Sequence, residues 1–279
     1  MVLAKSYSRP QGIHLLDALL ARGQRIFTTQ DAHAVAQELG ILPTTASWAL
    51  GELARSGWVK RLRRGLYAID EASRGGHSPH PFAIATALVQ PSAISHWSAL
   101  AHHGLTEQIP RVVTATTPKD VLTPRMRTRR PVSDGSSSTW DIDGLSIRYI
   151  RVRPDRFWGT DQVWVDEFSR VSITDRERTI LDGFVSPEVF GSLHEVLGAL
   201  EEHFAEIDIP RLVSYAIRYR QGSAIKRLGY ILEQLDAPSD VLQPLRQFPI
   251  KGFRLLDPQG SAQGEYVTSW SIRDNTRRK

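Results

Sequence analysis

The chain has 279 residues, of which 41% are hydrophobic and 23% charged, a composition typical of a folded protein and not of a disordered one. It contains no cysteine, which excludes disulfides and thiolate metal sites and favours a reducing, cytoplasmic location. No apolar run approaches the ~20 residues that cross a bilayer, and the first residues lack the apolar core of a signal peptide. Of the net charge of +5, residues 1–70 carry +4, which favours a polyanionic partner for this part.

Three helices are predicted at the start of the chain. Apolar residues recur at helical spacing over 12–22, 28–39 and 43–56, and a glycine follows each segment. Only the tripeptide Gly-Ile-Leu joins the last two segments, which is the spacing of a helix-turn-helix. Residues 58–69 then have the pattern of two short strands around a basic turn. The sequence therefore predicts a winged helix-turn-helix.

The ends of these helices carry signals of different strength. Thr28 and Asp31 have the spacing of a capping box, with Asp in place of the usual Glu. Pro43 suits the first turn of the third helix, but Leu42 stands where a polar N-cap is usual. The third helix is therefore expected to begin without a side-chain cap.

Base contacts are expected from the second helix of the pair, which lies in the major groove of DNA in such modules. Hydroxyls can contact phosphates or bases, and a tryptophan can pack on a sugar or a thymine methyl group. The candidates at the starts of the second and third helices are Thr28, Thr29, Thr44, Thr45, Ser47 and Trp48. The alternative for Trp48 is a partly buried ring that braces the wing.

The predicted wing concentrates positive charge. Its strands are expected at 58–62 and 66–69, with a turn at 63–65 in which Gly65 lets the backbone reverse. The turn brings four basic tips to one edge, where they can contact phosphates: Lys60, Arg61, Arg63 and Arg64. A basic run alone is typical of a solvated surface, but its position directly after a helix-turn-helix favours DNA.

A polar segment rich in glycine and proline, 73–79, predicts a linker between a DNA-binding domain at 1–72 and a second domain at 80–279. The second domain is expected to be mixed α/β, so the predicted fold class of the whole chain is α+β. The expected helices are near 81–89, 95–103, 174–185, 187–204, 210–220 and 223–235, and the expected strands are at 111–117, 145–152, 161–173, 252–256 and 265–272.

Several longer stretches carry a family resemblance. They are FTTQDAHAVAQELG through GLYAI, AISHWSALAHHGL, SITDRERTILDGF, RLGYILEQL and LLDPQGSAQGEYVTSWSIRDN, which together cover most of the chain. These stretches resemble the AbiEi family of antitoxins from bacterial type IV toxin–antitoxin and abortive-infection systems. The resemblance implies an N-terminal winged helix that represses its own operon. It also implies a C-terminal domain that neutralises a cognate nucleotidyltransferase toxin, often without a stable complex.

The expected partner on DNA is the chain's own promoter. A single winged helix buries a small interface, so tight binding calls for two copies on an inverted repeat. We expect a monomer or weak dimer that pairs on double-stranded DNA. No membrane partner is expected.

Histidines cluster in the second domain without a recognisable ligand spacing. Five fall within 27 residues: His77, His80, His96, His102 and His103. Histidine is the commonest metal ligand, but no acidic or cysteine ligands stand at metal-binding spacing beside these. We therefore expect neither a metal nor another cofactor.

The motif DRERTILD invites a structural and a functional interpretation. Glu177 is expected to complete a capping box with Thr174, and Arg178 to pair with Asp182 four residues later. The functional alternative is that Arg176 or Arg178 contacts a partner.

An enzyme targeted by the winged helix, such as a nuclease, is the alternative function. Similar front ends are joined in some bacterial proteins to magnesium-dependent nuclease domains, which need a lysine two residues after a carboxylate. The nearest arrangement is Asp257 with 265–267, and Val267 stands where the lysine is required. Phosphate-binding glycine motifs and a nucleophile elbow are also absent. We therefore expect no catalytic residues and no enzymatic activity.

Two further arginine groups lie in the second domain, at 125–130 and 148–156. Either they form a solvated, locally paired surface, or they form a second polyanion surface for DNA or RNA. In the second group, Arg151 and Arg153 are expected to share one side of a strand. The candidates for this surface are Arg127, Arg129, Arg130, Arg151 and Arg153.

Overall fold

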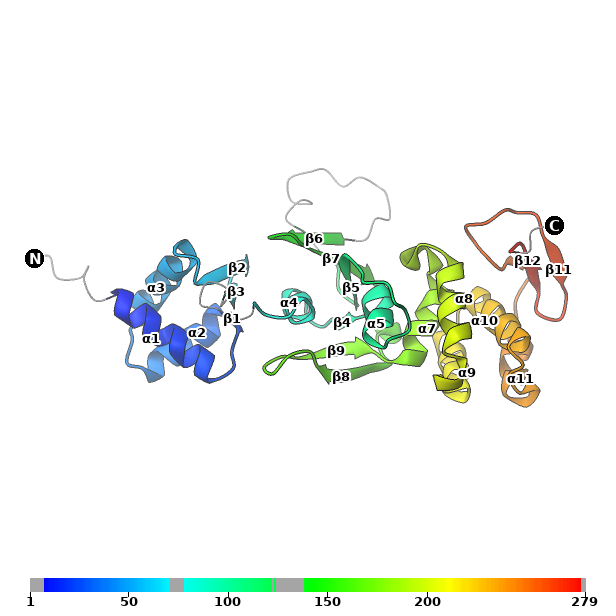
Figure 1. Ribbon diagram of the computed structural model, residues 1–279, viewed down its shortest axis with the longest axis horizontal. Helices are drawn as coiled ribbons and strands as arrows, with labels where there is room; N and C mark the ends of the chain where they lie inside the picture. The colour runs from blue at the N-terminus through cyan, green and yellow to red at the C-terminus, as the bar shows by residue number, and fades with distance from the viewer. Residues whose placement is uncertain (1–7, 71–77, 122, 124–137, 277–279) are drawn as a thin grey trace, which may run out of the picture.

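The computed structural model describes residues 8–70, 78–121, 123 and 138–276. Its parts follow one another along a long axis (Figure 1): a small helical module, a central sheet with two helices, and a group of helices that ends in a small sheet. This mixed architecture confirms the predicted α+β class. No helix in the described part of the chain has both the length and the hydrophobicity that crossing a bilayer requires.

The N-terminal module is a winged helix-turn-helix. Its elements are α1 (Ser8–Ala21), β1 (Ile26–Thr28), α2 (Thr29–Glu38), α3 (Pro43–Arg55), β2 (Val59–Arg63) and β3 (Leu66–Ile69). The three strands form an antiparallel sheet of order β1-β3-β2. Leucines of α1 pack against the buried faces of α2 and α3 in one core. The predicted helices and hairpin are confirmed, with the turn one residue later than expected, at 64–65.

Helix ends in this module follow the sequence signals. Thr28 Oγ1 accepts a hydrogen bond from the Asp31 amide at 3.1 Å, and the Asp31 carboxylate accepts one from the Thr28 amide at 2.7 Å. The predicted capping box is therefore confirmed. Leu42 is the N-cap of α3, makes no side-chain cap hydrogen bond and is 68% exposed, while Pro43 occupies the first turn. The uncapped start of α3 is confirmed as well.

A six-stranded sheet forms the middle of the molecule. Its strands and helices are α4 (Pro81–Leu88), β4 (Ala93–Ile94), α5 (His96–His102), β5 (Val112–Thr117), β6 (Ser138–Ile142), β7 (Leu145–Arg151), the 3-10 turn η2 (Pro154–Arg156), β8 (Thr160–Trp164) and β9 (Arg170–Thr174). The strand order is β6-β7-β5-β4-β9-β8. The pairs β5–β7 and β4–β9 are parallel, and the other pairs are antiparallel.

The two faces of this sheet differ, because successive side chains of a strand point to opposite faces. Val113 and Ala115 of β5 and Ile147 of β7 pack with α4 in an apolar cluster. Thr114 points the other way, where its hydroxyl accepts a hydrogen bond from the Ser98 amide of α5 at 3.0 Å. The helices α4 and α5 therefore cover opposite faces, and the α5 face carries more polar side chains.

The remaining elements form a helical layer and a small sheet at the C-terminal end. They are α7 (Arg176–Val185), η3 (Pro187–Phe190), α8 (Leu193–Glu202), η4 (Phe204–Glu206), α9 (Ile209–Tyr219), α10 (Gly222–Gln234), α11 (Ser239–Gln247), β10 (Arg254–Leu255), β11 (Glu265–Val267) and β12 (Ile272–Asp274). One large apolar core joins these helices. Trp270 is fully buried in it, over Gly229 of α10, where any larger side chain would overlap the indole ring.

The start of α7 corrects a prediction. The N-cap is Asp175, whose carboxylate accepts a hydrogen bond from the Arg178 amide at 2.7 Å, so the expected capping box of Thr174 and Glu177 is wrong. Glu177 instead accepts a hydrogen bond from the Asp208 amide at 3.1 Å, at the start of α9. Asp175, the next residue in the chain, therefore has the capping role that local spacing assigned to Thr174, and the Glu177 carboxylate binds the start of α9 instead.

The predicted pair of Arg178 and Asp182 is confirmed at 2.8 Å, and both side chains are buried. Arg178 also donates to the Trp158 carbonyl at 2.6 Å and lies over the Trp158 ring. With 1% of its surface exposed, Arg178 has no surface to offer a partner, so that part of the functional alternative is wrong. Arg176 is partly exposed and pairs with Glu206.

Candidate nucleic-acid interface

The helix α3 presents an open polar face. Ala46, Ala49, Leu50 and Leu53 are buried against the rest of the module, so the opposite side of the helix faces outward. Thr44 and Ser47 are exposed, Thr45 is half-buried, and 46% of the surface of Trp48 is accessible. The hairpin of β2 and β3 lies between α3 and the central sheet in Figure 1, so neither the central sheet nor the C-terminal helices cover this face. A helix that displays hydroxyls and an aromatic ring in this way can enter a major groove.

Trp48 and Trp58 have different environments. Trp58 packs against the apolar core of the module, whereas Trp48 is not among the side chains that pack there. The ring that braces the wing is thus Trp58. Trp48 keeps nearly half of its surface available for a sugar or a thymine methyl group.

Two of the predicted contact residues are also tied to the module itself. The Thr28 hydroxyl serves the α2 cap, and Ser47 Oγ lies 2.9 Å from His33 Nε2 of α2. The Ser47–His33 contact joins the two helices of the helix-turn-helix. His33 did not stand out in the sequence, because its significance depends on the crossing of α2 and α3. Thr29 lies beside the wing, since its amide donates to the Gly65 carbonyl at 3.0 Å.

The wing is a tight hairpin with an irregularity in β2. Arg61 pairs with Tyr67 and Arg63 with Leu66, so Leu62 is an extra residue between them. This bulge turns Leu62 into the protein while Arg61 and Arg63 both stay exposed. Gly65 has a φ of +75°, a conformation that the tight turn requires and that glycine adopts without strain.

The four basic side chains of the wing divide into two pairs. Lys60 Nζ lies 3.0 Å from a carboxylate oxygen of Asp70, and Arg63 Nε donates to the Leu88 carbonyl of α4 at 3.2 Å. The side chains of Arg61 and Arg64 are exposed and make no hydrogen bond or ion pair with any residue that the structure describes. Lys60 and Arg63 therefore fix the wing to the rest of the protein, and Arg61 and Arg64 are available to contact phosphates.

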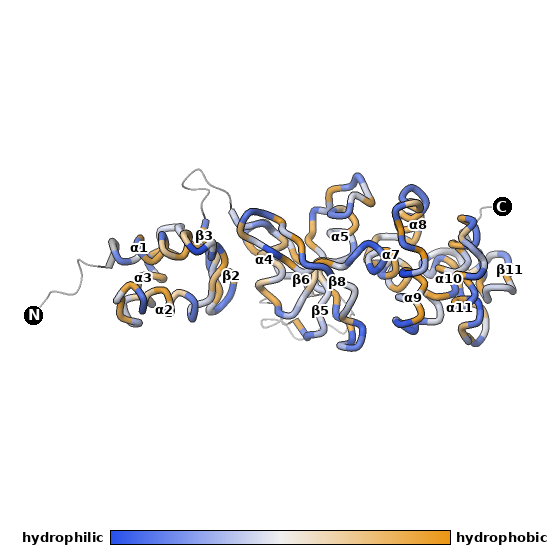
Figure 2. The backbone as a smooth tube through the Cα atoms, turned by 90° about the horizontal axis from the view of Figure 1, so that it is seen from below, coloured by the Kyte–Doolittle hydropathy of each residue, from blue (hydrophilic) through white to orange (hydrophobic). Residues whose placement is uncertain are grey.

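The wing also packs on the central part of the molecule. Leu62, Leu66 and Ala68 share an apolar cluster with Ala83 and Leu88 of α4. The views of Figures 1 and 2 agree that the β2–β3 hairpin is the side of the module that faces α4. The expected separation of two domains by the linker at 73–79 lies largely outside the described residues, and the domain boundaries stay a prediction.

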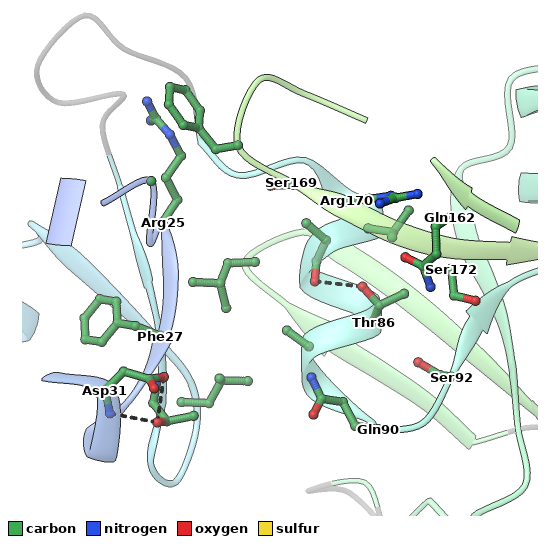
Figure 3. Close-up of a pocket in the computed structure, with 18 of the residues that line it drawn as sticks. Arg25, Phe27, Asp31, Thr86, Gln90, Ser92, Gln162, Ser169, Arg170 and Ser172 are labelled. Atoms are coloured by element: carbon green, nitrogen blue, oxygen red, sulfur yellow. Dashed lines mark hydrogen bonds between the residues drawn. The ribbon is translucent and has the colours of Figure 1, made fainter. Parts of the chain in front are cut away.

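A cleft of about 700 Å³ marks the seam between the module and the central sheet. Figure 3 shows Arg25, Phe27 and Asp31 on the module's side, with Thr86 and Arg170 among the labelled residues opposite. The Arg25 guanidinium lies 3.8 Å from the centroid of the Phe168 ring, which reaches over from the loop between β8 and β9. This cation–π contact and the apolar cluster of the wing hold the two parts together.

Two exposed arginines of the second part, Arg151 and Arg153, form ion pairs. Arg151 pairs with Asp120 at 2.9 Å and Arg153 with Asp155 at 3.0 Å. Arg151 ends β7 and Arg153 lies beyond it, so the expectation that both share one side of a strand is wrong. Arg127, Arg129 and Arg130 lie outside the described residues. A second polyanion surface stays a prediction.

The described histidines have structural positions. His80 caps α4 by accepting a hydrogen bond from the Phe82 amide at 3.1 Å, and His103 Nε2 lies 2.7 Å from the Thr174 carbonyl. His96 is buried at the start of α5, and His77 lies outside the described residues. Within the described ranges, no three histidine or acidic residues are grouped so that they could hold a metal ion.

The residues of the alternative nuclease arrangement lie in the small C-terminal sheet and beside it. The Asp257 carboxylate accepts a hydrogen bond from the Gln259 amide at 2.9 Å, and its backbone is joined to Asn275. Glu265 and Val267 are the ends of β11, a short strand paired with β12. These contacts stabilise the small C-terminal sheet.

The three helices and the hairpin of residues 8–70 place this part of the chain in the winged helix-turn-helix class. Residues 14–69 match the model of a family described as "Transcriptional regulator, AbiEi antitoxin". This match confirms the family resemblance over residues 14–69.

The comparisons with whole proteins bear on the fold. The chain is similar to the RV2827C protein from Mycobacterium tuberculosis, with a TM-score of 0.63 and 17% sequence identity. The similarity covers 94% of this chain and 90% of that one, so the two share the order and arrangement of their parts. A comparison with curated proteins found no match.

Proposed function

We propose that this chain is a sequence-specific DNA-binding autorepressor and the antitoxin to a nucleotidyltransferase toxin. The family match of residues 14–69 supports a regulatory antitoxin role. The observation that carries the DNA-binding part is the exposed face of α3, followed in the chain by Arg61 and Arg64, which have no partner among the described residues. A cytoplasmic location is part of the proposal, because the chain lacks cysteine.

In this proposal the contacts divide by chemistry. Thr44, Thr45 and Trp48 meet base edges in the major groove, and Ser47 contacts a phosphate or base through the hydroxyl that also meets His33. Arg61 and Arg64 contact phosphates beside the groove, with Thr28 and Thr29 at the start of α2 close to the same strand. Lys60 and Arg63 hold the wing in place and add charge to its edge.

Two copies on an inverted repeat complete the proposal for DNA. One module presents a single helix, so pairing on the repeat is needed for a specific interface of ordinary size. Neutralisation of the toxin is proposed for the rest of the chain. It proceeds either by direct contact or indirectly.

The test of the DNA proposal removes the two free arginines. Arg61→Ala combined with Arg64→Ala deletes about two phosphate contacts per copy. We expect operator affinity to fall at least about tenfold at moderate salt, and the magnitude of the slope of log affinity against log salt to fall by about 2 for each bound copy. Fluorescence anisotropy with the chain's own promoter over a salt series measures both quantities.

The matched control removes the same charge at the other end of the molecule. Lys251→Ala combined with Arg254→Ala changes two exposed residues near the C-terminal sheet. We expect the affinity and salt slope of the parent. If the Arg61 and Arg64 variant binds as tightly as the parent, or if both double variants lose affinity equally, the wing is not the phosphate contact.

The enzymatic alternative has its own experiment. Plasmid DNA and tRNA are incubated with the full chain and Mg²⁺. The autorepressor proposal expects both nucleic acids to stay intact, and cleavage that depends on the chain would replace it with a targeted nuclease.

A further inference from the structure

A second pocket, of about 660 Å³, lies on the α5 face of the central sheet. The strand register places Thr139 of β6, Arg148 of β7 and Thr114 of β5 in one row across three neighbouring strands, and all three line the pocket. Their neighbours Val113 and Ile147 point to the opposite, apolar face. The pocket is therefore floored by the polar side of the sheet, and none of its lining residues belongs to the winged module.

Arg148 differs from the other arginines of its group. Arg151 and Arg153 pair with carboxylates, and the Arg156 guanidinium lies 4.4 Å from the centroid of the Tyr219 ring. Arg148 Nε is buried and has no hydrogen-bond partner among the described residues. A buried guanidinium N–H without an acceptor is rare in folded proteins, and a bound group is one of its common explanations.

The charges around the pocket fit an anion. Arg111 lines the same pocket, and neither Arg111 nor Arg148 forms an ion pair with a described residue. Glu188 is the single acidic residue of the lining, is exposed and is not paired with either arginine. The planar fork of an arginine side chain matches the oxygens of a phosphate, and charge-assisted hydrogen bonds of this kind are strong.

Apart from Gln108 and Ser146, the rest of the lining is mostly apolar. Trp97 is partly buried against the helical core, and Ile109 is 91% exposed at the pocket's edge. Aromatic and aliphatic surfaces of this kind pack against the faces of nucleobases, and the volume lies in the range of ordinary ligand sites. A cationic floor beside an apolar wall favours a ligand that has both a phosphate and a flat apolar ring.

We propose that this pocket binds a phosphorylated nucleoside, with its phosphate on Arg148 and Arg111 and its base against Trp97 and Ile109. Two sources offer this chemistry: a free nucleotide, and the terminal nucleotide of a single-stranded RNA. The site is separate from the proposed DNA interface.

The experiment titrates the full chain by calorimetry with AMP, ATP, inorganic phosphate and a short single-stranded RNA with a terminal phosphate. Arg148→Gln removes the charge and keeps some hydrogen-bonding capacity, and it is expected to weaken binding about 10-fold to 100-fold. The matched control, Arg254→Gln, removes an exposed arginine outside the pocket and is expected to bind like the parent. Trp97→Ala is expected to weaken ATP binding more than phosphate binding.

The outcomes separate the sources of the ligand. Binding of ATP that competes with the RNA supports a site for free nucleotides, and binding of the RNA without binding of AMP or ATP supports a terminal nucleotide. The proposal is overturned if no probe binds at millimolar concentration, or if Arg148→Gln and Arg254→Gln behave alike. Unchanged circular dichroism and promoter binding of Arg148→Gln show that the variant is folded and keep this test independent of the DNA proposal.

Discussion

The contacts of each side chain in the winged module indicate whether it stabilises the module or is available to bind a partner. Thr28 closes a capping box, Lys60 pairs with Asp70, and Arg63 donates to a carbonyl of α4. Arg61 and Trp48 are exposed and have no such task among the described residues. Because these two side chains can bind a nucleic acid without breaking a contact to a described residue, they are the ones to substitute first.

Trp48→Ala tests base recognition at the residue scale. If the ring packs on a thymine methyl or a sugar in the groove, its loss lowers affinity for the operator by about 1–3 kcal/mol and lowers affinity for unrelated DNA less. The ratio of the two affinities, measured by competition at one salt concentration, is the readout. Thr44→Ala on the same face is the comparison for a hydroxyl contact, and equal losses on operator and unrelated DNA would contradict base recognition by Trp48.

The buried His96 side chain is expected to make the free energy of unfolding depend on pH. Its burial is the main cause that lowers the pKa of the imidazole to about 4, with nearby Asp182 favouring and Arg178 opposing the charged form. An unfolded histidine has a pKa near 6.5, so between these values the unfolded chain binds more protons. This contribution to stability, about 3 kcal/mol, is complete above pH ~6.5 and is lost as the pH falls toward 4.

Urea unfolding between pH 7 and pH 4 measures this effect. His96→Asn is the variant of choice, because His96 has a φ of +53° and asparagine tolerates that conformation. We expect the variant to be less stable at pH 7 but to lose less stability on acidification than the parent. Equal slopes for both proteins would mean that His96 does not titrate in this range.

At the scale of elements, the start of α3 is the weak point of the recognition surface. Leu42 occupies the N-cap, and 68% of its surface is exposed. Its side chain accepts no hydrogen bond from the first amides of the helix. An apolar N-cap leaves those amides to water or to an anion. In the proposed complex, a DNA phosphate at this end of α3 accepts hydrogen bonds from these amides.

Leu42→Ser is expected to stabilise the chain. A serine N-cap accepts a hydrogen bond from the first turn and contributes about 1 kcal/mol, while the exposed leucine loses little burial. Thermal unfolding measures the gain, and Leu42→Ala is the control that removes the side chain without adding a cap. A serine variant that is no more stable than the alanine variant would show that the first turn is already satisfied.

Elements with a strong local signal were predictable, and elements held by distant contacts were not. The cap at Thr28 and the glycine stops of the module are local, and the structure has them at the expected residues. The helix α11 contains Pro244, which argues against a helix, yet Leu242 and Leu245 are buried against neighbouring helices and hold it in place. The two-residue strand β4 depends on β5 and β9 on either side, which no local pattern shows.

At the scale of the whole molecule, the wing joins the module to the central sheet. Leu62, Leu66 and Ala68 are at most 5% exposed and share one apolar cluster with α4. Shared burial of this kind couples the unfolding of the parts it connects. The orientation of α3 relative to the rest of the chain is therefore tied to the packing of the wing.

We expect one cooperative unfolding transition for the full chain by calorimetry. Leu66→Ser removes apolar contact and buries a hydroxyl at the seam, so it is expected to destabilise by about 2–4 kcal/mol and to lower the temperature at which the C-terminal helices unfold as well. Arg64→Ala, exposed in the same hairpin, is expected to leave the transition in place. Two separate transitions in the parent would show that the module and the central sheet fold independently.

The sequence alone was sufficient to predict the winged helix-turn-helix fold. Helical periodicity, glycine stops and a basic hairpin are local patterns, and each short segment satisfies its own pattern. The sequence also indicated which residues could contact DNA. Only the tertiary structure decided which remain available, since Lys60 and Arg63 find acceptors on Asp70 and α4, and Arg151 finds one on Asp120. The tertiary structure also placed Arg148 Nε in a pocket floored by three strands, with no acceptor among the described residues, because partners and pockets are made by residues that folding brings together from distant parts of the chain.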